Sequence, residues 1–406
     1  MPSRPAPTLA ALVGGVYLPM LLAQIGVGAL IPIIPHAAVT LGATLAIAGV
    51  MSALLPAARA AFDIPGGTLL ARIGLRRTML AACAIAVVAY AVAALHLSIW
   101  LLAVAIAVVG LSSASLLVAT QTALNALVPA NRHASTMAAL SAVVSVGGIA
   151  GPLIGSAIIG ASSIWVVMWF CAAATVLAAV AIVLSPLLRQ AEASTGERVA
   201  TRTVLARNRA VLSTVGLGVF FGCVLRGVPQ MGLPLWTEHL GFDPATTSLV
   251  YAIFAGGVLA GTPVSAFLAR RFGRLTPLTI TLTGSAALTV VLVFTHATVD
   301  VTVCAGALGV LIGIGSGLFL TMATDVVHED QAEFFGVWRV LIDGGLTAAP
   351  ILLAVASAAS LLAGGLVLGA AMAVPSGILI ARFLPRYTPQ ASRRARRAAG
   401  LPVDAG

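Results

Sequence analysis

The sequence predicts an all-α integral membrane protein with twelve transmembrane helices arranged as two pseudo-symmetric halves of six. Three observations predict this fold: an apolar composition, twelve apolar runs of membrane-spanning length, and landmarks that recur once along the chain. Of 406 residues, 60% are hydrophobic and 8% charged, and the mean hydropathy is +1.09. Soluble domains carry about 25% charged residues, so the chain is a membrane protein.

The apolar runs are close to or above the roughly 20 residues that a helix needs to cross a bilayer. The predicted spans are 9–35, 43–70, 78–95, 98–124, 135–158, 163–187, 210–235, 245–269, 275–295, 301–327, 333–356 and 359–384. Only the weak stretch 355–360 divides the last two. The first run follows no small-residue cleavage site, so we expect a transmembrane helix there and not a removed signal.

The basic residues predict the orientation of the helices. All 22 are arginine, which excludes a Walker-type or Schiff-base lysine. With a cytoplasmic N-terminus, 19 of the 22 fall in inner loops or tails and none in outer loops, as the positive-inside rule requires. We therefore expect a multi-pass protein of the cell (plasma or inner) membrane with both termini cytoplasmic, and no nucleic-acid partner despite the net charge of +10.

An internal repeat divides the chain, because landmarks recur at an offset of 199 residues. These are Pro35 and Pro234, Gly42 and Gly241, and the tripeptides at 72–74 and 271–273. The predicted parts are an N-terminal half 1–187, a cytoplasmic linker 188–209, a C-terminal half 210–386 and a basic cytoplasmic tail 387–406. Such a repeat predicts a substrate site near the membrane midplane and rocking of one half against the other.

The loop after the second span resembles the signature loop of the major facilitator superfamily, in which a glycine and three residues precede Asp-Arg-x-Gly and trailing basic residues. The matching residues are Gly67, Arg72, Gly74, Arg76 and Arg77. The signature aspartate is replaced by Ala71. This resemblance, with the repeat and the helix count, covers nearly the whole chain and implies a transporter of the twelve-helix superfamily fold.

The fifth span contains GGIAGPLIG, which resembles the G-x-x-x-G-P-x-x-G motif of proton-coupled drug antiporters in that superfamily. The matching residues are Gly147, Gly151, Pro152 and Gly155. Three glycines at intervals of four form one smooth face suited to close helix packing, and the Gly-Pro step predicts a bend that faces the partner half. The basic residue usual in the fourth helix of the antiporters is replaced by Ile106.

Charged side chains inside the spans are the main candidates for function, because burial in a membrane is costly. Arg59 and Asp63 are four residues apart and share one helix face, as do Arg339 and Asp343. Each pair is either structural or functional, and Asp63 and Asp343 are the candidate proton-coupling carboxylates. Arg226 has no acidic neighbour in the sequence, so it either extends to the outer interface or faces the cavity and a polar or anionic group of the substrate.

Further candidates fall into two groups. Polar residues of the cavity are expected at Gln24, Gln230 and Tyr251, besides Ser112, Ser113 and Ser115. Inner-gate contacts are expected at Asp325, Glu333 and Arg271, with Glu333 facing Arg72 or Arg76 in place of the missing loop aspartate. The four cysteines and six histidines have no ligand spacing, so neither a metal nor another cofactor is expected.

These features together predict a secondary transporter, not an enzyme, that exports a small amphipathic compound in exchange for protons by alternating access. Its partners would be the substrate, protons and the lipid bilayer, and we expect a monomer. Two alternatives remain open. One is a uniporter or importer of sugars or organic anions with the same fold, and the other is a membrane-embedded transferase, which would need clustered acids for metal-diphosphate binding.

Overall fold

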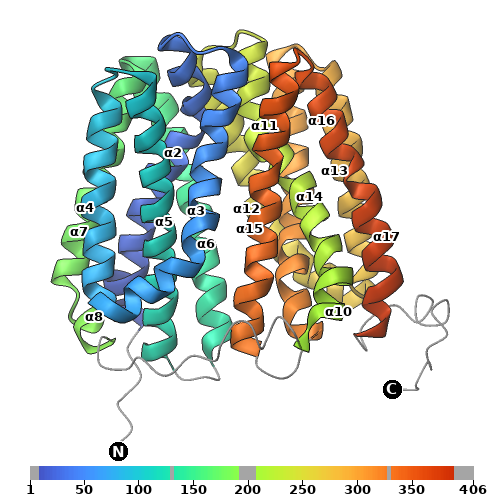
Figure 1. The fold of residues 1–406 in the computed structure, drawn as a ribbon, viewed down its shortest axis with the longest axis horizontal. Helices are drawn as coiled ribbons and strands as arrows, with labels where there is room; N and C mark the ends of the chain where they lie inside the picture. The colour runs from blue at the N-terminus through green and yellow to red at the C-terminus, as the bar shows by residue number, and fades with distance from the viewer. Residues whose placement is uncertain (1–8, 129–131, 192–206, 327–330, 388–406) are drawn as a thin grey trace, which may run out of the picture. The chain divides into compact units, whose positions relative to one another are not determined.

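The computed structural model describes residues 9–128, 132–191, 207–326 and 331–387. Every regular element in these ranges is a helix, and twelve spans are long and apolar enough to cross a membrane (Figure 1). The predicted all-α fold is therefore confirmed. The chain divides into two compact units, unit 1 with Met1–Glu197 and Thr237–Ala252, and unit 2 with Arg198–Trp236 and Ile253–Gly406.

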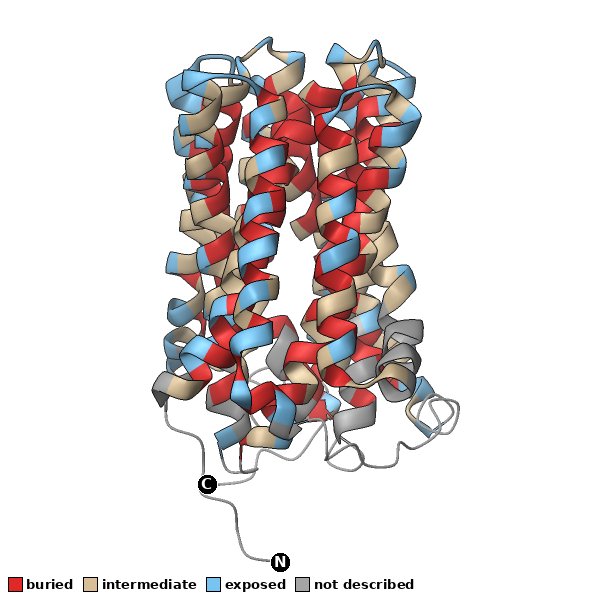
Figure 2. Cartoon of the chain, turned by 90° about the vertical axis from the view of Figure 1, so that its left-hand side faces the viewer, coloured by how far each residue is buried: buried red, intermediate tan, exposed pale blue. Residues whose placement is uncertain are grey.

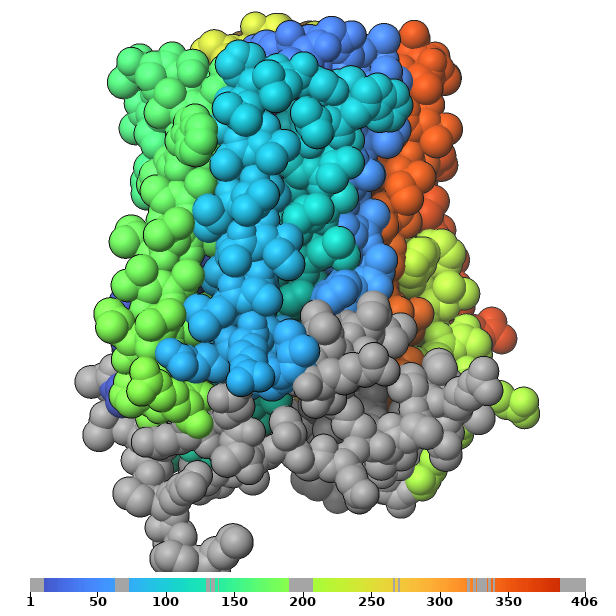
Figure 3. Space-filling view, turned by 60° about the vertical axis from the view of Figure 1, so that its left-hand side comes forward, coloured from blue at the N-terminus to red at the C-terminus, as the bar shows by residue number. Residues whose placement is uncertain are grey.

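Unit 1 contains the first six spans. Its helices are α1 (Leu9–Leu12), the π-helical turn η1 (Val13–Tyr17), α2 (Leu18–Thr40), α3 (Leu45–Ile73), α4 (Leu75–Ala94), α5 (Ile99–Leu127), α6 (His133–Ala161), α7 (Ile164–Leu184) and α8 (Pro186–Ala191). Helix α2 packs on α6 and α7, α3 packs on α5, and α4 packs on α5 and α7. Figure 3 shows α4 and α7 side by side on one face of this unit.

The second set of spans begins at residue 209. Its helices are α10 (Arg209–Val211), the π-helical turn η3 (Leu212–Gly216), α11 (Leu217–His239), α12 (Pro244–Phe272), α13 (Leu275–Phe294), α14 (Thr298–Val326), α15 (Gln331–Ala358), α16 (Leu362–Ala371), α17 (Ala373–Phe383) and the 3₁₀ turn η4 (Leu384–Arg386). In unit 2, α13 packs on α14, α16 and α17, and α15 packs on α16. The last residues of α11 and the first of α12 belong to unit 1.

The weakest predicted boundary, between the last two spans, is a short turn. Helix α15 ends at Ala358 and α16 begins at Leu362. Ser360 has a φ of +57°, and the Leu361 N–H donates to the Ala356 carbonyl at 2.8 Å. These contacts close the turn and separate the eleventh helix from the twelfth, as predicted.

The backbone conformation repeats at the same offset of 199 residues as the sequence landmarks. The π-helical turns η1 and η3 begin 199 residues apart, and so do α2 and α11, which are both 23 residues long. Gly42 and Gly241 have φ values of +86° and +76°, and Gly74 and Gly273 have +86° and +73°. A side chain is strained at such angles, so both copies need glycine at these helix ends.

The glycine face of α6 packs against α2 within unit 1. A Cβ atom on Gly147 would lie 2.6 Å from Cβ of Gln24. The equivalent position of the second half repeats this approach, because a Cβ on Gly345 would lie 2.7 Å from Cβ of Cys223. The motif therefore holds neighbouring helices of one half together, as close packing of its glycines requires, and the expectation that its bend faces the partner half stays a prediction.

The helix surfaces carry large apolar side chains that no protein atoms cover. Trp100, Leu184 and Phe294 are 79%, 73% and 75% exposed, and Figure 2 shows exposed positions recurring along single helices between buried ones. In water such a surface would aggregate, whereas lipid chains solvate it. The pattern of exposure therefore agrees with a multi-pass membrane protein.

Candidate functional site

A buried polar site in unit 1 is built around Arg59 at the crossing of α3 and α5. Gly110 lets the two helices approach closely, because a Cβ atom there would lie 2.5 Å from the Leu55 carbonyl oxygen. One turn further along each helix, Arg59 Nε donates to Ser113 Oγ at 2.7 Å, and Ser113 Oγ donates to the Gly110 carbonyl at 2.8 Å. The crossing of α3 and α5 thus positions both the donor, Arg59, and the acceptor, Ser113.

The sequence predicts a different partner for Arg59, namely Asp63, which lies one turn along α3. The side chain of Asp63 lies outside the described residues, so this pairing stays a prediction. Ser113 was expected only as a polar residue of the cavity. Its role as the hydrogen-bond acceptor for Arg59 depends on how α3 and α5 cross, which the sequence pattern of either helix does not contain.

A small cavity of about 20 Å³ lies beside this pair, among α2, α4, α5 and α7. Its polar lining comes from Tyr90, Ser112, Ser113 and Thr175. Tyr90 is fully buried, its hydroxyl has no hydrogen-bond partner among the described residues, and the charge of Arg59 acts on it. The cavity is large enough for one water molecule, which would satisfy such a hydroxyl. The cavity is therefore mainly apolar, with a few polar groups beside the Arg59–Ser113 pair.

The second half brings together Arg226 of α11 and Asp343 of α15. Both side chains are half-buried, and both act electrostatically on the Cys223 thiol. This proximity follows from the close approach of α15 to α11 at Gly345 and Cys223. Arg226 and Asp343 therefore both lie in the surroundings of Cys223, although the sequence around Arg226 contains no acidic residue, and whether Arg226 faces the substrate stays a prediction.

The remaining cavity candidates lie on three helices. Gln24 is buried where α2 meets α6, beside Gly147. Gln230 is half-buried on α11, and Tyr251 is buried on α12. Their predicted contact with substrate stays a prediction.

The signature loop connects α3 to α4 and ties α4 to α7. Gly74 caps α4 with φ +86° and ψ 161°, a conformation that essentially only glycine adopts. Arg76 Nη2 donates to the Val183 carbonyl in the last turn of α7 at 2.9 Å, while Arg77 is exposed. In the second copy Arg271 is exposed and lies over the Phe272 ring at 5.6 Å. The loop therefore anchors helix ends at the side predicted to be cytoplasmic.

Several predicted residues have side chains outside the described part of the chain. These are Asp63, Arg72, Asp325, Glu333 and Arg339. Gly67 lies within α3. The predicted contact of Glu333 with the signature loop, and the Arg339–Asp343 pair, stay predictions. Among the residues that are described, no three histidine, cysteine or acidic side chains are grouped as metal ligands would be.

Twelve apolar helices among the described residues, with a repeated backbone, define the chain as a multi-pass membrane protein. The sequence model of the Major Facilitator Superfamily matches residues 16–350, and the chain belongs to that superfamily. Membership in a transporter family excludes the alternative of a membrane-embedded transferase.

Solved structures share the whole fold at low sequence identity. One is a mutant form of the peptide transporter POT, with a TM-score of 0.75 and 12% identity over 96% of this chain and 98% of that one. Another is a POT family transporter in complex with 5-aminolevulinic acid, with a TM-score of 0.74 and 12% identity over 92% and 96% of the two chains. No curated protein sequence matches the chain significantly. The likeness establishes the fold, and the substrate has to be argued from the site.

Proposed function

We propose that this transporter exports a small amphipathic compound in exchange for protons, by alternating access. The observation that carries the proposal is that a basic and an acidic residue, Arg226 and Asp343, both lie close enough to Cys223 to act on its thiol at the α11–α15 contact. Charges inside membrane spans are expensive and mark ion or substrate pathways. A carboxylate beside an arginine can bind and release a proton as its surroundings change between the two accessible states.

Proton binding and substrate binding would both depend on the charge of Asp343, so that each would exclude the other. When Asp343 is ionised, it attracts a cationic group of the substrate, and when Asp343 is protonated this attraction is lost, so the proton and the substrate exclude one another as exchange requires. Asp63 and Arg59 are the corresponding candidates in the first half, where Ser113 already holds the arginine. Of the two candidate proton-coupling carboxylates, Asp343 is the better supported, because the structure describes its side chain and not that of Asp63.

The proposed direction of transport and topology come from the sequence. The motif at Gly147–Gly155 resembles that of the drug antiporters, although its glycines serve packing within unit 1, and arginine placement puts both termini in the cytoplasm. A solved relative in fold binds 5-aminolevulinic acid. Small zwitterions therefore belong in the substrate panel beside amphipathic cations and organic anions.

Export from efflux-deficient cells tests the proposal. Cells that express the wild type should accumulate less of at least one compound, and a protonophore that collapses the gradient should abolish the difference. Asp343→Asn should lose gradient-driven export while substrate binding persists. The matched control is Asp300→Asn, in the first turn of α14, which should export normally.

Two outcomes would refute parts of the proposal. Full gradient-driven export by Asp343→Asn would remove Asp343 from the mechanism, and the same result with Asp63→Asn would remove Asp63. Flux in proteoliposomes that ignores the pH gradient would identify the uniporter or importer instead.

A further inference from the structure

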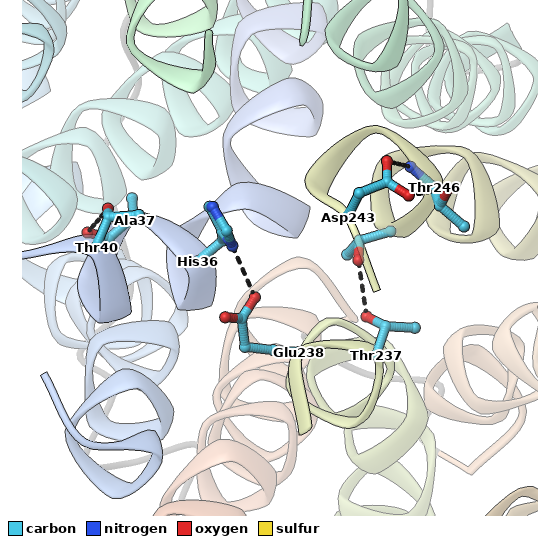
Figure 4. A network of polar contacts seen from close by, with 8 residues as sticks. His36, Ala37, Thr40, Thr237, Glu238, Asp243 and Thr246 are labelled. Atoms are coloured by element: carbon cyan, nitrogen blue, oxygen red, sulfur yellow. Dashed lines mark hydrogen bonds and ion pairs between the residues drawn. The ribbon is translucent and has the colours of Figure 1, made fainter. Parts of the chain in front are cut away.

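A network of polar contacts joins the end of α2 to the segment Thr237–Ala252, and both belong to unit 1. His36 Nδ1 lies 3.1 Å from Glu238 Oε2, and the two side chains point at one another in Figure 4. The side chains of His36 and Glu238 are 28% and 14% exposed. Solvent therefore reaches the imidazole, while the carboxylate is largely shielded.

The turn that follows Glu238 is held by its own hydrogen bonds (Figure 4). Thr247 Oγ1 donates to Thr237 Oγ1 at 3.1 Å, which ties the start of α12 to the end of α11. Asp243 accepts hydrogen bonds from the Thr246 N–H at 2.9 Å and the Thr246 hydroxyl at 2.6 Å, and these bonds lower the pKa of Asp243. The Glu238 carboxylate is therefore presented to His36 from an ordered turn.

A second contact holds the same segment to α6. Ser156 Oγ donates to the Ala245 carbonyl at 2.8 Å. Two of the segment's contacts are thus a neutral hydrogen bond to α6 and the His36–Glu238 contact with α2. The second of these includes a histidine, whose charge changes near neutral pH.

His36 is the only ionisable side chain of α2, which packs on α3, α5, α6 and α7. The other ionisable groups on these elements and on the segment are His133, Cys171, Arg59, Asp63, Arg72, Glu238, His239, Asp243 and Tyr251. Helix α5 has none, and His133 begins α6, far in sequence from Ser156. Asp243 is engaged as a helix cap. The groups that can act on Glu238 near neutral pH are therefore His36 and its chain neighbour His239.

We propose that His36 is a proton-binding site that fastens α2 to the end of α11 at the face predicted to be outside, with protons of the outer solution as its ligand. Histidine changes its charge between about pH 5 and 8. A neutral imidazole with its proton on Nδ1 donates a hydrogen bond to the Glu238 carboxylate. The imidazolium adds the attraction between two opposite charges to this bond.

Proton binding at His36 sets how easily the outer ends of α2 and α11 separate. The ionic part of the contact is present while the imidazole is protonated and absent when the imidazole is neutral. An acidic outer solution therefore strengthens the contact between α2 and the end of α11. The inference needs alternating access and the predicted orientation but neither proton coupling nor export, so a pH-independent flux would leave it standing.

A buried reporter on the same segment measures the opening. Ser248 is fully buried on α12, so Ser248→Cys should react with a membrane-impermeant maleimide only when the segment moves. The four native cysteines are buried and give the background in the parent protein. Rates at pH 5.5 to 8 are divided by those of Thr44→Cys, on the exposed α2–α3 turn, to remove the intrinsic pH dependence of thiols.

The corrected labelling rate should fall about two- to fivefold on acidification, the effect of an ion pair of this exposure. His36→Gln and Glu238→Gln should abolish the pH dependence, and His36→Arg should label slowly at every pH. His239→Gln, the matched control, should behave like the parent. A flat parent profile, an unchanged profile in His36→Gln, or loss of the dependence in His239→Gln alone would each overturn the proposal.

Discussion

Two adjacent glycines of α6 should respond to alanine with opposite signs. A Cβ on Gly147 would lie 2.6 Å from the Gln24 Cβ and 3.1 Å from the Ile25 nitrogen, whereas a Cβ on Gly148 would meet nothing within 4 Å. Ordinary carbon contacts are about 3.5–4.0 Å, so Gly147→Ala must push α2 and α6 apart by about 1 Å. Overpacking of this kind costs about 1–3 kcal/mol.

The helix propensity of alanine works in the other direction at both sites, by about 1 kcal/mol. Gly147→Ala should therefore be destabilising by up to about 2 kcal/mol, and Gly148→Ala stabilising by up to about 1 kcal/mol. The difference of about 1–3 kcal/mol separates the midpoints of thermal unfolding of a unit of about 200 residues by roughly 2–12 °C. The buried native cysteines allow a thiol-reactive dye to follow unfolding in detergent. Equal midpoints for the two variants would refute the packing described for α2 and α6.

Three further predictions follow from single contacts. Ser113→Ala removes the acceptor of the Arg59 hydrogen bond and should lower the free energy of unfolding by about 1.5–3 kcal/mol. The Ser115 hydroxyl donates to the Leu111 carbonyl of its own helix, so Ser115→Ala should cost clearly less. Equal costs for the two variants would contradict the assigned Arg59–Ser113 bond. Gly74→Ala should cost about 1–3 kcal/mol through its φ of +86°, measured as a lower unfolding midpoint than Gly148→Ala gives. The hydrogen bonds from Thr246 lower the pKa of Asp243. The difference in free energy of unfolding between the wild type and Asp243→Asn should therefore be constant above about pH 5 and should vanish as the pH falls through the lowered pKa. A difference that stays the same down to about pH 2 would contradict this.

The fold could be predicted because its determinants are local or periodic. Apolar runs set the twelve spans, and the recurrence of Pro35 and Gly42 as Pro234 and Gly241 revealed a register that the backbone follows in η1 and η3. The helix ends at Gly74 and Gly273 need glycine for a positive φ. That requirement is visible in the sequence as a repeated tripeptide.

The site could be predicted only in part, because its contacts join helices that are distant in sequence. Arg59 and Arg226 were marked by their charge in apolar surroundings, yet the Ser113 acceptor and the nearby Asp343 depend on how helices cross at Gly110 and Gly345. His36 and Glu238 carried no motif. The sequence also could not predict which helix the glycine face of α6 packs against, because a smooth face fits a neighbour in the same half as well as one in the other half.

Proton movement driven by substrate tests the central claim most directly. Purified protein in proteoliposomes with an internal pH indicator is exposed to a substrate found in the export screen, without an imposed gradient. Proton-coupled exchange predicts that wild-type vesicles change internal pH when substrate moves, and that Asp343→Asn vesicles move substrate without this change or not at all. Substrate flux in the wild type with no accompanying proton movement would contradict the account.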